Sequence, residues 1–385
     1  MAGLRGNPVE PAFFVPQNNM SMVNRKLIRR AAGSVLTLFV AYFLVLLIYG
    51  WSTDWVPEAQ VELKPIQPAK TNLVADSIVS FVTWNVGYGG LGAESDFFYD
   101  DQGMWYSGSS MIRTPEALVK KNIAGAIQFL KQTKSDFFLL QEVDVSSKRS
   151  YHIRQFDAYC QALPDFAVTM AENYRCNRVP IPLLEPWHAY GDVESGLGTF
   201  CRYQPATATR FQLPGHYPMP NRMFQLDRCV ALHRFPTNRG HDLVVINVHN
   251  AAYDPGDKIK AIQLPFLRDL ALAEFAKGNY VVIGGDWNQC PPFFHFDRFM
   301  PDNTQGFRQG NIPDSFFPEN WRFAYDPGTP SNRKCRDPYL PGQTFVTLID
   351  FFLVSPNVQV KTVKGIDQGF QFSDHQPVWL EVQLL

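Results

Sequence analysis

The sequence predicts a layered α/β domain that follows one apolar segment of membrane-spanning length. Runs of β-branched and aromatic residues recur between residues 77 and 385 and are typical of buried strands. Amphipathic helix patterns alternate with these runs, as in a fold where helices cover a sheet. Hydrophobic residues make up 45% of the 385-residue chain, which is enough for a large core and excludes disorder of the whole chain.

The amino end has a character of its own. Arg25, Lys26, Arg29 and Arg30 precede residues 31–49, which contain no charge. A bilayer-spanning helix needs about 20 apolar residues, and no small-residue cleavage site follows this one. We therefore expect a cytoplasmic basic tail at 1–30 and an uncleaved, single-pass signal anchor at 31–50, with the rest of the chain outside the cytoplasm. The alternative, a buried core helix, would show one polar face, and this segment has none.

The remainder is expected to form one domain. Residues 51–76 contain three Pro residues among mixed polar residues, which predicts a stalk. From residue 77 to residue 385 no composition shift marks a second boundary. Residues 171–193 and 291–342 are rich in Pro, Asn, Arg and aromatic residues and are expected to be long surface loops that shape a substrate site.

Two helices and the cysteines complete this outline. Thr114, Pro115 and Glu116 form a helix-start pattern, and an apolar stripe continues to residue 130. A second helix is expected at 258–277, kinked or interrupted at Pro265. Six Cys residues permit disulfides or free buried thiols, and the absence of Cys-X-X-Cys argues against a zinc knuckle.

Polar residues follow the ends of the predicted strands. The apolar run 281–283 passes through two glycines, which permit a tight turn, into Asp286, and Asn288 stands two residues later. Because functional groups gather at strand ends in layered α/β folds, we expect these side chains to converge. The other polar residues at strand ends are Asn85, Glu142, His249, Asp350, Asp374 and His375, with no Ser or Cys nucleophile among them.

Oxygen ligands without thiolates favour Mg²⁺, Mn²⁺ or Ca²⁺ over Zn²⁺, and Mg²⁺ typically uses one or two protein carboxylates together with substrate phosphate oxygens. Glu142 is the first candidate for a metal ligand, supported by Asn85 and Asp374. Asp286 would orient and deprotonate an attacking water, and Asn288 would hold that water or a phosphate oxygen. Together these assignments describe phosphoester hydrolysis.

The imidazoles and arginines have their own expected roles. His249 and His375 would stabilise phosphoryl charge or protonate the leaving oxygen, with Asp350 orienting His375. Arg202 and Arg228 are candidate phosphate ligands, as is Arg222. Each residue taken alone also has a structural interpretation, as a turn former, a core histidine or a surface charge. The number of such residues, each at a strand end, makes a purely structural interpretation improbable.

Five short motifs occur in this chain order: Trp84-Asn85, Leu140-Gln141-Glu142, Gly285-Asp286-Trp287-Asn288, Ile349-Asp350-Phe351 and Ser373-Asp374-His375. In this order they resemble the motifs of the endonuclease/exonuclease/phosphatase superfamily, which is deoxyribonuclease I-like. With the apolar segment, the likeness implies a membrane-anchored, bacterial-type member. It implies a four-layer α/β/β/α sandwich of two mixed sheets and Mg²⁺-dependent cleavage of phosphoesters. One departure is Leu348, where many members carry Arg.

The substrate stays open between several classes. The first hypothesis is a metal-dependent phosphodiesterase acting outside the cytoplasm on a lipid head group or nucleotide; the alternatives are a nuclease for extracellular DNA or RNA and a non-catalytic, membrane-tethered binding module. The net charge of −1 and the anchor favour a small or membrane-borne phosphoester over nucleic acid. Aromatic residues in the loop 86–106 suit base stacking, lipid contact or a satellite core. No obligate protein partner is indicated.

Overall fold

The computed structural model describes residues 22–385 except 101–102, 253, 255, 296–298 and 300–309. The chain divides into two units, residues 1–49 and 50–385. Helix α1 (Met22–Ser52) holds the apolar segment, and its most apolar 18-residue window has a mean hydropathy of 2.4. By length and composition it is able to cross a membrane, although a signal sequence near an N-terminus meets the same criterion. Most of the expected basic tail, residues 1–21, lies outside the described residues.

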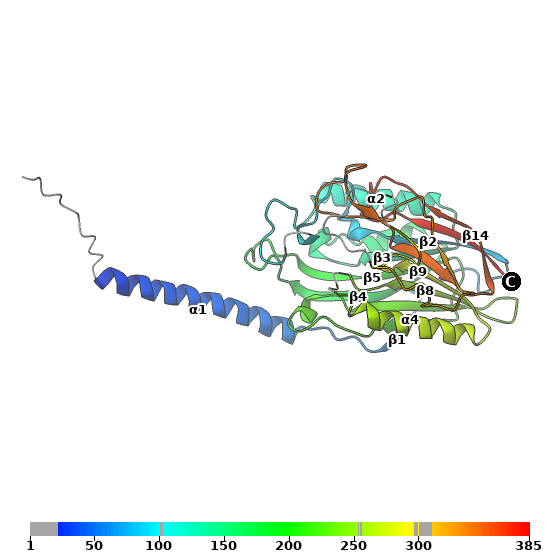
Figure 1. Ribbon diagram of the computed structural model, residues 1–385, viewed down its shortest axis with the longest axis horizontal. Helices are drawn as coiled ribbons and strands as arrows, with labels where there is room; N and C mark the ends of the chain where they lie inside the picture. The colour runs from blue at the N-terminus through cyan, green and yellow to red at the C-terminus, as the bar shows by residue number, and fades with distance from the viewer. Residues whose placement is uncertain (1–21, 101–102, 253, 255, 296–298, 300–309) are drawn as a thin grey trace, which may run out of the picture. The chain divides into compact units, whose positions relative to one another are not determined.

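The folded unit contains two mixed β-sheets (Figure 1). In spatial order the seven-stranded sheet consists of β1 (Gln60–Glu62), β6 (Thr207–Gln212), β7 (Cys229–Phe235), β8 (Leu243–His249), β9 (Tyr280–Asp286), β13 (Asp350–Val354) and β10 (Arg322–Ala324). The six-stranded sheet consists of β14 (Val358–Gly365), β15 (Val378–Leu384), β2 (Ile78–Asn85), β3 (Phe137–Asp144), β5 (Gly191–Cys201) and β4 (Ala167–Val179). Two short strands, β11 (Asn332–Arg333) and β12 (Val346–Thr347), pair separately.

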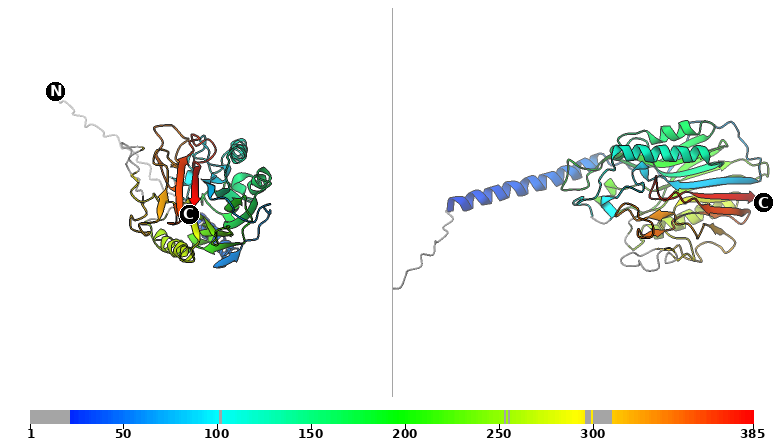
Figure 2. Two further views of the ribbon diagram at one scale, coloured as in Figure 1. Left: turned by 90° about the vertical axis from the view of Figure 1, so that its right-hand side faces the viewer. Right: turned by 90° about the horizontal axis from the view of Figure 1, so that it is seen from above.

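Helices cover the outer faces of the two sheets (Figures 1 and 2). Helices α2 (Glu116–Gln132) and α3 (Gln155–Ala162) pack on the six-stranded sheet, and α4 (Lys260–Phe275) packs on the other. Between the sheets lies a core in which the rings of Phe81 and Phe137 stack at 4.7 Å. Short 3-10 turns are η1 (Gly87–Gly89), η2 (Phe98–Asp100), η3 (Lys148–Ser150) and η4 (Asn221–Phe224). The predicted four-layer sandwich is confirmed.

Strand pairing explains where the polar strand ends meet. β2 and β3 are parallel neighbours, with Asn85 opposite Gln141, and β8 and β9 are parallel neighbours, with His249 opposite Asp286. Every residue of β8 and β9 is buried, as expected for strands covered on both faces. The carboxyl ends of all four strands therefore lie at one edge of the sandwich.

Two expectations about local structure are wrong. The proposed stalk is part of the folded unit: β1 pairs with β6, and Val74 is only 1% exposed. Residues 171–179 and 191–193 belong to the paired strands β4 and β5, because cross-strand pairing outweighs their loop-like composition. Helix α4 is not interrupted at Pro265, and Leu264 and Leu267 on either side of it are buried against the sheet. All six cysteines are free thiols.

Candidate active site

Four strand-end side chains, contributed by both sheets, meet at this edge. The amide nitrogen Nδ2 of Asn85 lies 3.3 Å from Oε1 of Glu142 and 3.1 Å from Oδ2 of Asp286. The Nε2 atom of His249 lies 3.8 Å and 3.4 Å from the same two oxygens. Two carboxylates, one amide and one imidazole are therefore in contact, and all four belong to the polar strand-end residues predicted from the sequence.

Unusual backbone conformations deliver these side chains. Glu142 has a φ of 54° and falls where the pairing of β3 with β5 shifts register, so the strand bulges at this residue. Asn288 has a φ of 51°, and its backbone N–H donates to Oδ1 of Asp286 at 2.9 Å. Gly285 has no room for a side chain, because a Cβ there would lie 1.9 Å from the carbonyl oxygen of Val248. The Gly-Gly-Asp sequence is thus needed where β9 passes closely along β8.

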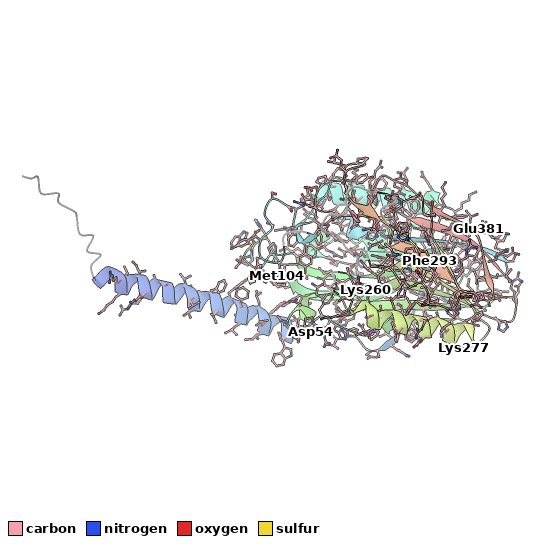
Figure 3. All side chains as sticks on the ribbon, in the orientation of Figure 1. Asp54, Met104, Lys260, Lys277, Phe293 and Glu381 are labelled. Atoms are coloured by element: carbon pink, nitrogen blue, oxygen red, sulfur yellow. The ribbon has the colours of Figure 1, made fainter. Side chains whose placement is uncertain are left out.

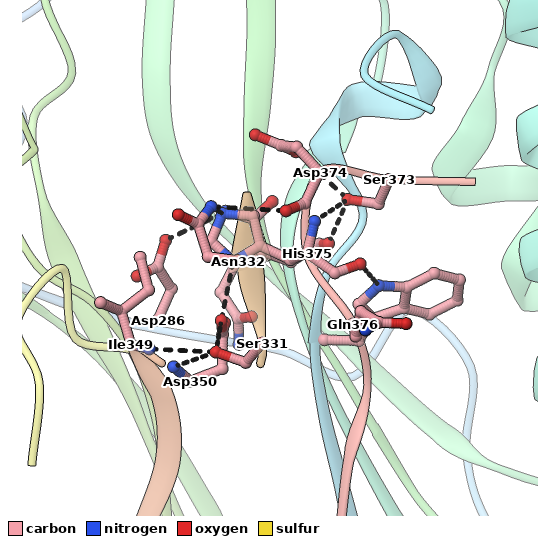
Figure 4. A network of polar contacts seen from close by, with 12 residues as sticks. Asp286, Ser331, Asn332, Ile349, Asp350, Ser373, Asp374, His375 and Gln376 are labelled. Carbon is pink, nitrogen blue, oxygen red and sulfur yellow. Dashed lines mark hydrogen bonds and ion pairs between the residues drawn. The ribbon is translucent and has the colours of Figure 1, made fainter. Parts of the chain in front are cut away.

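A carboxylate–imidazole pair lies beside Asp286 (Figure 4). Asp350 pairs with Asp286 in register across β13 and β9, and its Oδ2 lies 2.8 Å from Nδ1 of His375. Burial raises the pKa of Asp350 to about 6, with the neighbouring His375 opposing the rise. Burial alone would lower the pKa of His375, but Asp350 and then Asp286 raise it well above its usual value. The neighbouring carboxylates thus favour the protonated form of His375, whose Nε2 lies 3.8 Å from Oδ2 of Asp286.

His249 has the opposite character. It is 1% exposed, and burial lowers its pKa well below the usual value, an effect to which Arg228 and His375 add. Its Nδ1 is a buried atom without a hydrogen-bond partner within the described part of the chain. The surroundings of the two imidazoles thus shift their pKa values in opposite directions, which suits a division of roles between them.

Two of the predicted metal ligands, Asn85 and Glu142, are in contact, and the third, Asp374, is close enough to influence the pKa of Glu142. Burial raises the pKa of Glu142, Arg149 opposes the rise, and Asp374 adds to it. The two carboxyl groups therefore repel each other, and a bound cation would relieve that repulsion. Oδ1 of Asn85 already accepts the N–H of Gly87 at 3.0 Å, and Oδ2 of Asp374 lies 3.5 Å from the Cys335 thiol. Such oxygen donors are of the type that hard divalent cations prefer.

A second possible cation-binding group overlaps the catalytic pair. Ligand atoms of Asp286, Asp350 and His375 lie within 4.8 Å of one another, and all three residues are buried. This group shares Asp350 and His375 with the carboxylate–imidazole pair, in which Nδ1 of His375 lies 2.8 Å from Oδ2 of Asp350.

Two of the three candidate substrate arginines, Arg228 and Arg202, lie in different places. Arg228 is 7% exposed, its Nε and Nη1 are buried without hydrogen-bond partners in the described residues, and its charge lowers the pKa values of Glu142 and His249. Arg202 follows β5 and pairs with Asp136 at 3.2 Å, just before β3 begins. That is the opposite end of β3 from Glu142, so the structure does not bring Arg202 to the site. The antiparallel course of β5, which the sequence does not reveal, is the reason.

The sequence did not single out several residues around the catalytic pair. Nδ2 of Asn332 lies 3.0 Å from Nε2 of His375, and the Ser331 hydroxyl donates to Oδ2 of Asp350 at 2.7 Å (Figure 4). Arg149, whose charge lowers the pKa of Glu142, was also not singled out; its guanidinium carbon lies 4.0 Å from the centre of the Tyr88 ring. Ser331 and Asn332 fall in the expected 291–342 loop, whose composition suggested a role in shaping the site without indicating which residues.

Comparison with known proteins identifies the fold and the family of this chain. Solved structures of similar fold include an endonuclease/exonuclease/phosphatase from Beutenbergia cavernae (17% identity, TM-score 0.54, covering 80% of this chain and 72% of that one). Others are a Bacteroides vulgatus protein of the same description (16%, TM-score 0.48, 80% and 100%) and the human nocturnin catalytic domain with bound sulfate (12%, TM-score 0.47, 84% and 96%). No curated protein sequence matches significantly. The profile of the Endonuclease/Exonuclease/phosphatase family matches residues 82–375, and the chain belongs to this family, whose members are phosphoester hydrolases.

Proposed function

We propose that this chain is a metal-dependent phosphodiesterase, tethered by α1 and acting outside the cytoplasm. The observation that carries the proposal is the convergence of Asn85, Glu142, His249 and Asp286, with the Asp350–His375 pair directly behind. A binding module that had lost catalysis would have no need of an intact carboxylate–imidazole pair in a buried site, where unpaired charges are costly.

The residues divide the chemistry as follows. Asp286 accepts the proton of the attacking water, and Asn288, held by its Nδ2–H to the carbonyl of Asn250 at 3.0 Å, positions that water or a phosphate oxygen. His375, cationic and oriented by Asp350, stabilises the charge that develops on the phosphoryl group. Neutral His249 donates a hydrogen bond to the same group.

Two further groups would neutralise the negative charge of the substrate phosphate. Arg228 offers buried N–H groups that lack a partner in the described chain, which suits a phosphate oxygen. A divalent cation held by Glu142 and Asn85, with Asp374 in support, would polarise a phosphoryl oxygen when bound.

The test is a screen of the full-length chain with Mg²⁺ or Mn²⁺ against plasmid DNA, RNA, sphingomyelin, phosphatidylinositol phosphates, nucleotides and a generic aryl phosphodiester. Asp286→Ala serves as the inactive variant, and Asp269→Ala, which removes a carboxylate that is 69% exposed on α4, serves as the control. Hydrolysis that depends on Asp286 and not on Asp269 supports the proposal. A chain that hydrolyses none of these substrates, or an Asp286→Ala variant as active as wild type, contradicts it. Preferential cleavage of DNA or RNA would assign the nuclease function instead.

A further inference from the structure

Two loops at the catalytic edge expose large aromatic side chains. The exposed fractions are 48% for Trp105, 57% for Tyr106 and 70% for Trp187. The segments that carry them are hydrogen-bonded together: the N–H of Leu184 donates to the Trp105 carbonyl at 3.1 Å, and the carboxylate of Glu185 accepts from Ser107. The aromatic residues are therefore displayed by a braced structure, which we call the aromatic edge (residues 104–107 and 183–187).

The aromatic edge lies at the same end of the folded unit as the active site. Asp144, at the end of β3, pairs with Ser195 of β5, so Gly191 and the β4–β5 connection extend beyond the catalytic strand ends. The C-terminal strand β15 places residue 383 opposite Ile78, at the start of β2 and thus at the other end (Figure 1). In Figure 3, Met104 and Asp54 are both labelled at the end of the folded unit opposite Glu381, which belongs to β15.

The chain also enters the folded unit at this end. Gly50, its first residue, packs so closely on Phe224 that a Cβ there would lie 2.7 Å from the ring. The carbonyl of Phe224 accepts the hydroxyl of Tyr174 at 2.9 Å, on β4. Farther along the same strand, Arg178 donates to the carbonyl of Pro186 at 2.9 Å, next to Trp187. One strand therefore connects the entry point of the chain to the aromatic edge.

This arrangement favours a bilayer as the surface the edge contacts. If the apolar helix spans a membrane, Gly50 emerges at the membrane surface, and the residues packed around it lie close to that surface. Trp and Tyr are the side chains enriched at membrane–water interfaces, because their rings are apolar and their N–H or O–H group is polar. The Glu185 carboxylate within the edge disfavours a polyanion such as nucleic acid.

We propose that the aromatic edge inserts into the interface of a phospholipid bilayer and holds the catalytic edge at head-group level. The consequence for substrate, which rests on the proposed phosphodiesterase function, is a phosphoester carried by a membrane lipid. Soluble phosphodiesters would reach the catalytic residues whether or not the aromatic edge contacts a membrane.

Lipid contact is tested by photo-crosslinking, independently of catalysis. The full-length chain carries p-benzoylphenylalanine in place of Trp187 or Tyr106 and is reconstituted in phosphatidylcholine vesicles. The matched control carries it in place of Ile78, which is 48% exposed at the other end of the sheet. We expect lipid adducts at 187 and 106 at least about tenfold above those at 78, since interfacial burial is local. Equal labelling at all three positions, or none at 187, overturns the proposal.

The consequence for substrate is tested with Trp187→Ser combined with Tyr106→Ser, both exposed, and with Trp187→Phe as the conservative control. We expect hydrolysis of vesicle-borne phosphodiester to fall about tenfold in the double variant, to be retained in Trp187→Phe, and to stay within about twofold on a soluble aryl phosphodiester. An equal loss on both substrates, or a loss confined to single-stranded nucleic acid, contradicts the lipid assignment. If the wild type hydrolyses nothing, the phosphodiesterase function fails, whereas the crosslinking result still decides the membrane contact.

Discussion

Neighbouring charges determine what each titratable side chain of the site is able to do. His249 and His375 are both buried, yet the pKa of one is lowered and that of the other is raised. The difference is Asp350, which lies 2.8 Å from His375, whereas the cationic Arg228 and His375 disfavour charge on His249. The same residue type thereby provides a cation and a neutral donor within one site.

Asp286→Asn is expected to lower turnover by about 10²–10⁴-fold, because the amide cannot accept the proton of the attacking water. The amide has nearly the shape of the carboxylate, so the fold should be retained. Steady-state kinetics on a generic phosphodiester and a thermal melt check both parts. Wild-type turnover in a folded variant would remove Asp286 from its role as base.

Arg228→Met is expected to reduce kcat/KM about 10–100-fold, because the substrate phosphate loses its buried charged donor. Stability should be unchanged or higher, since the variant removes buried N–H groups that lack partners in the described chain. Arg202→Met is the control, because Arg202 lies at the other end of β3, and its kcat/KM should stay within about twofold. The same loss in both variants would refute a specific contact at Arg228.

At the scale of the element, close packing between neighbouring strands and helices fixes the site. β9 carries Gly285 and Asp286 past β8, and α4 is joined to β7 by one buried carboxylate, that of Glu274. Gly285 and Glu274 have no catalytic role, yet their close contacts determine where the strand ends lie.

Gly285→Ala is expected to destabilise the fold by about 2–4 kcal/mol and to abolish activity, because its Cβ would overlap the Val248 carbonyl and push β9 away from β8. Denaturant unfolding measures the loss. Gly328→Ala is the matched control, since its nearest atom is the Asp326 carboxylate at 3.3 Å, and it should change stability by no more than about 0.5 kcal/mol. Equal stability of the two variants would show that β9 tolerates a side chain at 285.

Glu274→Gln tests the attachment of α4. Burial raises the pKa of Glu274, but hydrogen bonds from Arg234, Lys277 and Asn279 outweigh this and lower it to about 2. The unfolded chain therefore takes up this proton at higher pH than the folded chain, so the stabilisation is complete above about pH 4.5 and is lost as pH falls towards 2.

Glu274→Gln should lower the free energy of unfolding by about 1–2 kcal/mol at pH 7 and leave it unchanged near pH 2. The value at pH 7 takes into account that Arg234 and Lys277 are partly solvated. Urea unfolding across this range makes the measurement, with Asp269→Asn as the exposed control on the same helix. A destabilisation independent of pH would show that charge is not the cause.

At the scale of the whole molecule, the site exists only because two sheets stack. Asn85 and Glu142 come from the six-stranded sheet, and His249 and Asp286 from the seven-stranded one. Binding of a cation between them should therefore stabilise the sandwich as a unit.

Removal of divalent cations by EDTA is expected to abolish hydrolysis, and Mg²⁺ or Mn²⁺ should restore it. At about 100 times its Kd the ion should add about 2.7 kcal/mol to the free energy of unfolding, visible as a rise in Tm. Glu142→Gln should lose this rise because the amide is a weaker ligand for a hard cation. Full activity in EDTA, or an undiminished rise in the variant, would contradict a metal at Glu142.

The sequence by itself determined the strand-end residues. Buried strands require runs of apolar residues, and polar residues of the site, such as Asp286 and Asp350, stand out because they interrupt those runs. The sequence also determined the apolar helix and, through motifs in order, the four-layer fold. Only the tertiary structure decided that Arg228 lies at the site and Arg202 does not, that residues 60–74 join the domain, and that Asn332 contacts His375. These facts depend on pairing direction and on contacts between residues distant in the chain, and neither leaves a periodic signal in the local sequence.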